Sequence, residues 1–280
     1  MLRLLQLVFP LLFILVTSPP VIGQQSTIIV AEDSLKYILR QISTASTDSQ
    51  RLISNSSFQQ LLCKTLTLKG SYKHPFDSLK PIGKIASPDN KFRIIQWNFR
   101  MDDGTYRFFS FIQIPGNLEN RVITLSDHFS SLDEPEIQIL NADNWYGAQY
   151  YNIIPVLNEN SDTLYTILGW NGNNSLVTQK VIEILSFDKQ QKVTFGSPIF
   201  SRYNQGKNTR VIFRYSAQTS MILKPDYKRL MIICDRLIPL DPQLEGIYQQ
   251  YVPSSEVFDG FIFDHGKWLY TTGIDANFSR

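Results

Sequence analysis

The chain has very few of the residues that usually bind metals or carry out nucleophilic chemistry. Its 280 residues include two cysteines and three histidines. His74, His128 and His265 show no H-x-x-x-H or H-E-x-x-H spacing, and together with the cysteines they form no zinc pattern. There is no Walker loop, no Rossmann fingerprint and no G-x-S-x-G motif. The sequence therefore predicts no metal and no cofactor.

An excess of one charge is also missing. Twenty-seven Lys and Arg face 25 Asp and Glu, which gives a formal net charge of +2, and no run of basic residues occurs. Proteins that bind nucleic acid or anionic membranes usually carry such a run or patch. We therefore expect no nucleic-acid partner.

The two cysteines lie in apolar runs, Cys63 in LLCKTL and Cys234 in MIICDRL. Free cysteines commonly pack in such segments, so two buried thiols are the preferred interpretation. An oxidising compartment would also allow a disulfide between them, which would join the N-terminal region to the C-terminal part of the chain. The sequence does not give the distance between their Cα atoms, and both states stay open.

The longest apolar run lies at the N-terminus. Arg3 precedes residues 4–16, which are apolar except for one Gln and one Pro, and small residues follow before Gln24. This pattern is typical of a secretory signal peptide over residues 1–23 that is removed before Gln24. An uncleaved anchor is the alternative, but a span needs about 20 apolar residues and this run is shorter. We expect an exported protein, periplasmic or secreted, with no transmembrane helix after cleavage.

Residues 24–70 carry the helical signals. Apolar residues at helical spacing predict a short first helix, and Ser56 with Gln59 resembles a capping box that would begin a second one. The two predicted apolar stripes are Leu35, Ile38, Leu39 and Ile42, and then Phe58, Leu61, Leu62 and Leu66. A helical pair of this size is marginal alone, so these stripes are expected to pack on the rest of the chain.

Residues 71–280 read as a β-rich domain. Short runs rich in Ile, Val, Phe and Tyr alternate with turn residues, and an Asp-Gly turn at residues 101–104 predicts a hairpin. The expected strands are Phe92–Phe99, Thr105–Ile114, Tyr150–Val156, Leu164–Trp170, Thr178–Phe187, Val193–Phe195, Arg210–Leu223, Arg229–Cys234, Phe258–Phe263 and Trp268–Thr271. Turns are expected at residues 224–226 and 264–266. The predicted fold is mainly β, an antiparallel meander of roughly a dozen strands with a propeller-like or sandwich-like closure.

One turn-and-strand segment recurs. PDNKFRIIQW, residues 88–97, and SDTLYTILGW, residues 161–170, place the same residue types in the same order, and a partial third copy begins at Pro225. The starts are 73 and 64 residues apart, whereas propeller blades repeat every ~40–50 residues. A true repeat and two similar hairpins both remain open, because the same physics selects Asp at turns and aromatics on strands.

Three longer segments carry a family resemblance: IGKIASPDNKFRIIQWNF, YNIIPVLNENSDTLYTILGWNGNNSL and FDGFIFDHGKWLY. They resemble a group of exported proteins of Gram-negative bacteria that has no established activity. The resemblance covers the chain from about Phe76 onward and implies export and a β-rich domain. The Ser-Pro-Asp-Asn-Lys turn is also similar to the S-P-D-G-K turn of some β-propeller repeats.

Loop residues provide the candidate sites. A hydrolase acting on polysaccharide needs two carboxylates, which loops between strands often supply. The loop carboxylates are Asp102, Asp103, Asp133, Glu134, Glu136 and Asp143. Asp143, Trp145 and Tyr146 form the one stretch in which aromatic residues follow a polar loop, and we expect them to be exposed and to contact a ligand.

The preferred function is therefore an exported, non-catalytic β-rich protein with a binding or structural role and a glycan or another cell-envelope component as a possible partner. A secreted hydrolase that uses the loop carboxylates on polysaccharide is the alternative.

Overall fold

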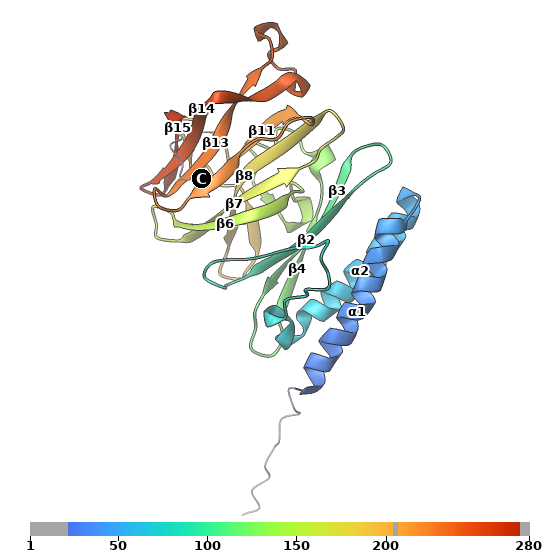
Figure 1. Ribbon diagram of the computed structural model, residues 1–280. Helices are drawn as coiled ribbons and strands as arrows, with labels where there is room; N and C mark the ends of the chain where they lie inside the picture. The colour runs from blue at the N-terminus through green and yellow to red at the C-terminus, as the bar shows by residue number, and fades with distance from the viewer. Residues whose placement is uncertain (1–21, 204–206, 275–280) are drawn as a thin grey trace, which may run out of the picture.

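The computed structural model describes residues 22–203 and 207–274. Two N-terminal α-helices are followed by strands that form three sheets, so the mainly β prediction is confirmed. The layers follow one another in the order helices, sheet 1, sheet 2 and sheet 3 (Figure 1). Within the described residues the sheets stack and do not close into a propeller.

The helices are α1 (Ile22–Thr44) and α2 (Asp48–Thr67). The expected signal segment lies outside the described residues except for Ile22 and Gly23, with which α1 begins. The capping box predicted at Ser56 is wrong, because the Thr47 side chain accepts a hydrogen bond from Gln50 N and begins α2 nine residues earlier. In the part of the chain that is described, no helix has both the length and the apolar character needed to cross a membrane.

The helical stripes pack on sheet 1, as predicted. Leu35, Leu39 and Ile42 of α1 meet Phe58, Leu62 and Leu66 of α2, and Ile38 and Leu61 are partly buried beside them. The same core continues into the outer face of sheet 1 through three side chains, Ile95, Trp97 and Phe111. Burial on the sheet stabilises a helical pair that would be marginal in water.

Sheet 1 is an antiparallel meander with the order β1-β2-β3-β4. Its strands are β1 (Gly83–Ala86), β2 (Arg93–Arg100), β3 (Tyr106–Ile114) and β4 (Arg121–Ser126). The predicted Asp-Gly turn is present, with Gly104 N donating to Met101 O at 3.0 Å. In β3, Phe108 faces sheet 2 and Phe111 faces the helices, so the strand is covered on both sides.

Sheet 2 contains the four-stranded antiparallel meander β6-β7-β8-β9, with β6 at one edge of the sheet. Its strands are β5 (Leu140–Asn141), β6 (Gln149–Leu157), β7 (Thr163–Asn171), β8 (Val177–Phe187), β9 (Val193–Phe195) and β11 (Arg210–Ser216). Both β9 and β11 pair with β8, at different parts of its length. In β7, Ile167 faces the core with sheet 1 and Leu168 faces the core with sheet 3.

Sheet 3 has the order β10-β15-β14-β13-β12. Its strands are β10 (Phe200–Ser201), β12 (Leu223–Asp226), β13 (Met231–Pro239), β14 (Tyr251–Asp264) and β15 (Lys267–Ile274). Two predictions are wrong here. Arg210–Leu223 is not one strand, because β11 ends at Ser216 and the chain then crosses to sheet 3. Residues 224–226 lie in β12 rather than in a turn, since an edge strand tolerates Pro225. The turn at 264–266 is confirmed by positive φ angles at His265 and Gly266.

The recurring segment occupies equivalent places in the three sheets. Residues 88–97, 161–170 and 225–234 each run into the second strand of a four-stranded antiparallel meander, β2, β7 and β13. Two matched aromatics meet across the first interface, because the Phe92 and Tyr165 rings pack edge to face at 4.8 Å. The unequal intervals follow from inserted elements, β5 before β6, and β10 and β11 before β12. The recurrence is therefore architectural.

Candidate functional site

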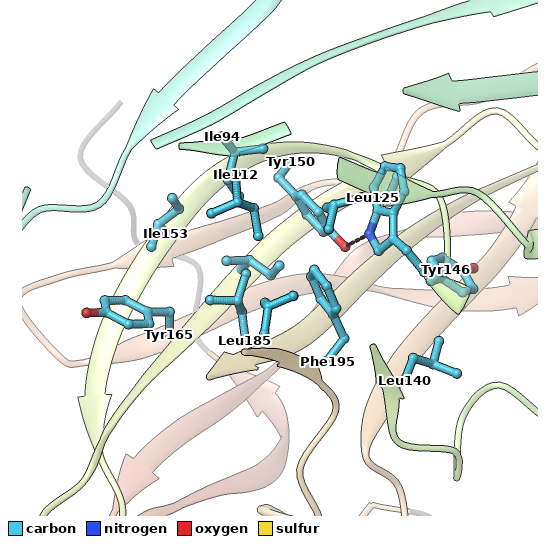
Figure 2. Packing of buried hydrophobic residues seen from close by; sticks show 14 of the residues in the cluster. Ile94, Ile112, Leu125, Leu140, Tyr146, Tyr150, Ile153, Tyr165, Leu185 and Phe195 are labelled. Atoms are coloured by element: carbon cyan, nitrogen blue, oxygen red, sulfur yellow. Dashed lines mark hydrogen bonds between the residues drawn. The ribbon is translucent and has the colours of Figure 1, made fainter. Parts of the chain in front are cut away.

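The structure does not expose the predicted ligand-contacting stretch. Asp143 is exposed, but Trp145 and Tyr146 are 0% exposed, so the expectation that these rings face solvent is wrong. Trp145 Nε1 donates to Tyr150 Oη at 2.7 Å (Figure 2). The Tyr146 hydroxyl donates to Gln179. The polar loop leads directly into the core between sheets 1 and 2, where each ring finds a hydrogen-bond partner.

A buried ion pair lies beside these rings. Arg210 Nε donates to Glu183 Oε1 at 2.6 Å, both side chains are 0% exposed, and Tyr150 Oη donates to Glu183 Oε2 at 2.5 Å. The Arg210 guanidinium also donates to the backbone carbonyls of Pro135, Gln138 and Phe195. Every polar atom of the pair is satisfied, which indicates a structural role for the pair in fixing the loop before β5 to sheet 2.

The predicted loop carboxylates are dispersed. Asp102 accepts from Asp48 N at 3.3 Å and Asp103 accepts from the Thr105 hydroxyl at 2.6 Å, both at the β2–β3 turn. Asp133 and Asp143 belong to the segment before β6. Glu134 and Glu136 differ from the others, because both line the cleft described next.

A cleft of about 690 Å³ lies between sheets 2 and 3. One wall is β11, the other is formed by β13, β14 and β15, and the segment around residues 134–137 borders it. Four tyrosines from separate segments line it, and we call it the tyrosine cleft: Tyr203, Tyr248, Tyr251 and Tyr270. Its volume lies within the ~300–1,000 Å³ of typical small-ligand sites.

The floor of the cleft holds a hydrogen-bonded carboxylate. Arg236 Nη2 donates to Asp259 Oδ1 at 2.6 Å, Arg236 Nε donates to Oδ2 at 3.0 Å, and Tyr270 Oη donates to Oδ2 at 2.7 Å. Burial raises the pKa of Asp259, but these hydrogen bonds outweigh it and hold the pKa below its ordinary value. Asp259 is therefore a fixed anion that orients both Arg236 and Tyr270.

The rim carries a second arginine–carboxylate pair. Arg214 Nη1 lies 2.5 Å from Glu136 Oε1, and its guanidinium stacks over the Tyr248 ring at 5.6 Å. Tyr248 is 42% exposed, and its ring lies 5.4 Å from that of Tyr251. The rim thus presents the Tyr248 ring, which the Arg214 guanidinium holds in place, next to the Arg214–Glu136 ion pair.

The thiols do not add reactive chemistry to the cleft. Cys63 and Cys234 are both free, Cys63 on α2 and Cys234 on β13, with sheets 1 and 2 between those elements. The alternative of a disulfide between them is therefore not formed. Cys234 lines the cleft, but burial raises its pKa, so the nucleophilic thiolate is disfavoured. Among the described residues, no group of three or more His, Cys, Asp and Glu side chains could hold a metal ion.

Little of this site could be predicted from the sequence. Arg236 and Asp259 are far apart in the chain and meet only because β13 pairs with β14. The tyrosines come from the β10–β11 connection, the end of the β13–β14 loop, and strands β14 and β15. Two predicted loop carboxylates, Glu134 and Glu136, do line the cleft, but the pairing of Glu136 with Arg214 could be found only from the structure.

In comparisons with known proteins, no family model, no curated protein and no solved structure matches the chain.

Replacing Asp259 with asparagine should change stability in a pH-dependent way. Near neutral pH we expect a loss of about 1.5–3 kcal/mol, because hydrogen bonds to a charged acceptor are lost. The folded-state pKa lies below the unfolded value near 3.8, so this contribution is present above that value and disappears as the pH falls through the folded pKa. Urea midpoints of wild type and Asp259→Asn should therefore converge on acidification.

The exposed Asp143 provides the matched control. Asp143→Asn should follow wild type at every pH in the same urea titrations. A gap between Asp259→Asn and wild type that stays constant into acid would show that the Asp259 charge contributes nothing to folding.

Proposed function

We propose that the chain is an exported, non-catalytic binding protein and that the tyrosine cleft binds a saccharide of the cell envelope. The observation that carries the proposal is the combination of tyrosine rings and fixed polar groups in one cleft of suitable volume. Tyrosine offers a flat apolar face and a hydroxyl on one side chain, and saccharides present apolar ring faces edged by hydroxyls. The apolar N-terminal run supports the export part of the proposal.

The charge distribution supports a largely neutral ligand. Glu136 and Asp259 are each paired with an arginine, and the other charged residues that line the cleft, Lys207, Glu134 and Asp235, leave no large excess of one sign. The two pairs still offer unused lone pairs and N–H groups to ligand hydroxyls. Because the groups are already held in place, little side-chain entropy is lost when a ligand binds.

The hydrolase alternative is less well supported by these contacts. A glycosidase needs one carboxyl group whose raised pKa keeps it protonated as a general acid. Asp259 has a lowered pKa, and Glu136 is held in an ion pair with Arg214. Burial raises the pKa of Asp235, which also lines the cleft, but its Oδ2 already accepts a hydrogen bond from Ile222 N at 2.6 Å. Binding without turnover is the activity we expect.

The test is binding to a panel of neutral and envelope-derived oligosaccharides, measured by calorimetry. Tyr248→Ala removes the exposed ring and should weaken the affinity at least tenfold, which is about 1.4 kcal/mol. Tyr37→Ala is the matched control, because Tyr37 is 64% exposed on α1, outside the cleft. It should bind like wild type.

Two results would contradict the proposal. One is equal binding by Tyr248→Ala and Tyr37→Ala. The other is release of reducing ends by wild type that Glu136→Gln abolishes, which would establish the hydrolase instead.

A further inference from the structure

A second pocket, of about 390 Å³, lies where one end of sheet 1 meets sheet 2. It is formed by the end of β2, the start of β3, the β7–β8 connection and the segment after β11. Six of its lining side chains matter for the inference: Arg100, Tyr106, Trp170, Ser175, Lys180 and Thr219. We call this site the two-cation pocket.

The charges that line the pocket have one sign. Arg100 and Lys180 contribute positive charges, and no carboxylate is among the described residues that line it. Burial lowers the pKa of Lys180, and Asp235 opposes this effect from outside the lining, where it accepts a hydrogen bond from Ile222 N at 2.6 Å. The rest of the surface is covered by hydroxyl, amide and aromatic groups. This surface complements an anion.

Acids on the neighbouring turn point their oxygens elsewhere. Asp103 accepts from both Thr105 N and its hydroxyl, at 2.9 and 2.6 Å. Asp102 Oδ1 lies 3.6 Å from Arg51 Nη1, on the side of α2. The positive charges of the pocket are therefore not neutralised by the turn next to them.

Two glycines allow the walls to close tightly. A Cβ at Gly172 would lie 2.5 Å from the Tyr106 ring, so only glycine lets that ring pack this closely against the β7–β8 connection. Gly104 has φ +86°, and its hypothetical Cβ would lie 3.2 Å from Arg100 Nη2 and 3.6 Å from Ser175 Cβ. The Trp170 ring packs edge to face on Tyr106 at 5.3 Å, which fixes the aromatic wall.

We propose that the two-cation pocket binds an anionic sugar unit, carboxylated or sulfated. Arg100 and Lys180 would receive the acidic group, the Ser175 and Thr219 hydroxyls would bond to ring hydroxyls, and Trp170 would contact the ring face. A bare oxyanion would leave most of the volume and the aromatic wall unused. The inference concerns a site separate from the tyrosine cleft and holds whether or not that cleft binds a saccharide.

Trp170 gives a direct readout of this pocket. Of the four tryptophans, Trp97, Trp145 and Trp268 are 0–3% exposed, whereas Trp170 is half-buried. Tryptophan fluorescence of the whole protein is titrated at constant ionic strength with methyl glucuronide, methyl glucoside and sodium sulfate. We expect a saturable change with the glucuronide, a much weaker one with sulfate, none with the glucoside, and loss of the signal in Trp170→Phe.

Variants of the two basic residues test whether their charges bind the acidic group of the ligand. Arg100→Gln and Lys180→Gln should each raise the Kd for the glucuronide at least tenfold, and Lys192→Gln, an exposed lysine of the β8–β9 turn, should leave it unchanged. Thermal unfolding verifies that each variant is folded, and Arg100 is exposed, so its replacement disturbs no core. Absence of saturation at millimolar ligand, equal binding of glucoside or sulfate, or equal loss in Lys192→Gln would overturn the proposal.

Discussion

Replacing Glu183 with alanine should destabilise the protein by about 3–5 kcal/mol, because it leaves the Arg210 charge buried without its partner. Arg210 is 0% exposed and cannot reach water to recover the lost interaction. The change also removes the acceptor of the Tyr150 hydroxyl in the same core. Urea unfolding followed by far-UV circular dichroism should show a lower midpoint with an unchanged slope.

An exposed ion pair is the natural control for this variant. Glu159 pairs with Lys267 at 2.9 Å, and both side chains are about half exposed or more. Glu159→Ala should not measurably shift the midpoint, since exposed pairs contribute little. Equal shifts for Glu183→Ala and Glu159→Ala would mean that the buried pair does not stabilise the link between β8, β11 and the loop before β5.

Trp97→Ala should have an effect of similar size at the other interface. Trp97 is 3% exposed, packs edge to face on Phe58 at 5.0 Å, stacks on Phe109 at 5.7 Å and donates to Asn55 Oδ1 at 2.7 Å. Removing a buried aromatic of this size costs about 3–5 kcal/mol through the cavity it leaves. Native-state hydrogen exchange should show lost protection in α1 and α2 before β7 and β8 are affected.

Trp97→Phe refines this prediction. It keeps an aromatic ring in the core but removes the hydrogen bond to Asn55, so its loss should be clearly smaller than that of Trp97→Ala. If the helices kept full protection in Trp97→Ala, the packing of Trp97 would not be what holds the helical layer on sheet 1.

Local patterns predicted the elements well, because turn chemistry and side-chain periodicity act over a few residues. The stripe Leu35–Ile42 and the hairpin at residues 101–104 are both present. The capping box predicted at Ser56 was wrong because a Ser three residues before a Gln also occurs inside helices. The N-cap of α2 is Thr47, which lies earlier in the chain. The stacking order of the sheets depends on long-range packing, which no local pattern records.

The candidate site was harder to predict for the same reason. Trp145 and Tyr146 follow a polar loop, but the next residues enter β6 and carry both rings into the core. Arg236 and Asp259 are unremarkable charged residues until the pairing of β13 with β14 brings them together. Glu183 did carry a signal, since a carboxylate within the apolar run VIEILSF of a central strand requires a buried partner.

The helices and the three sheets are stacked in order without closing on themselves, and this arrangement determines how far a local loss of structure spreads. Among the residues that the structure describes, each of the three hydrophobic cores lies between two adjoining layers, as in a quasi-one-dimensional array, so stability is close to a sum over adjoining interfaces. The helical pair then acts as a terminal unit that shields the apolar outer face of sheet 1 at one end (Figure 1). A chain built in this way can lose the order of one end layer while the middle of the array stays folded.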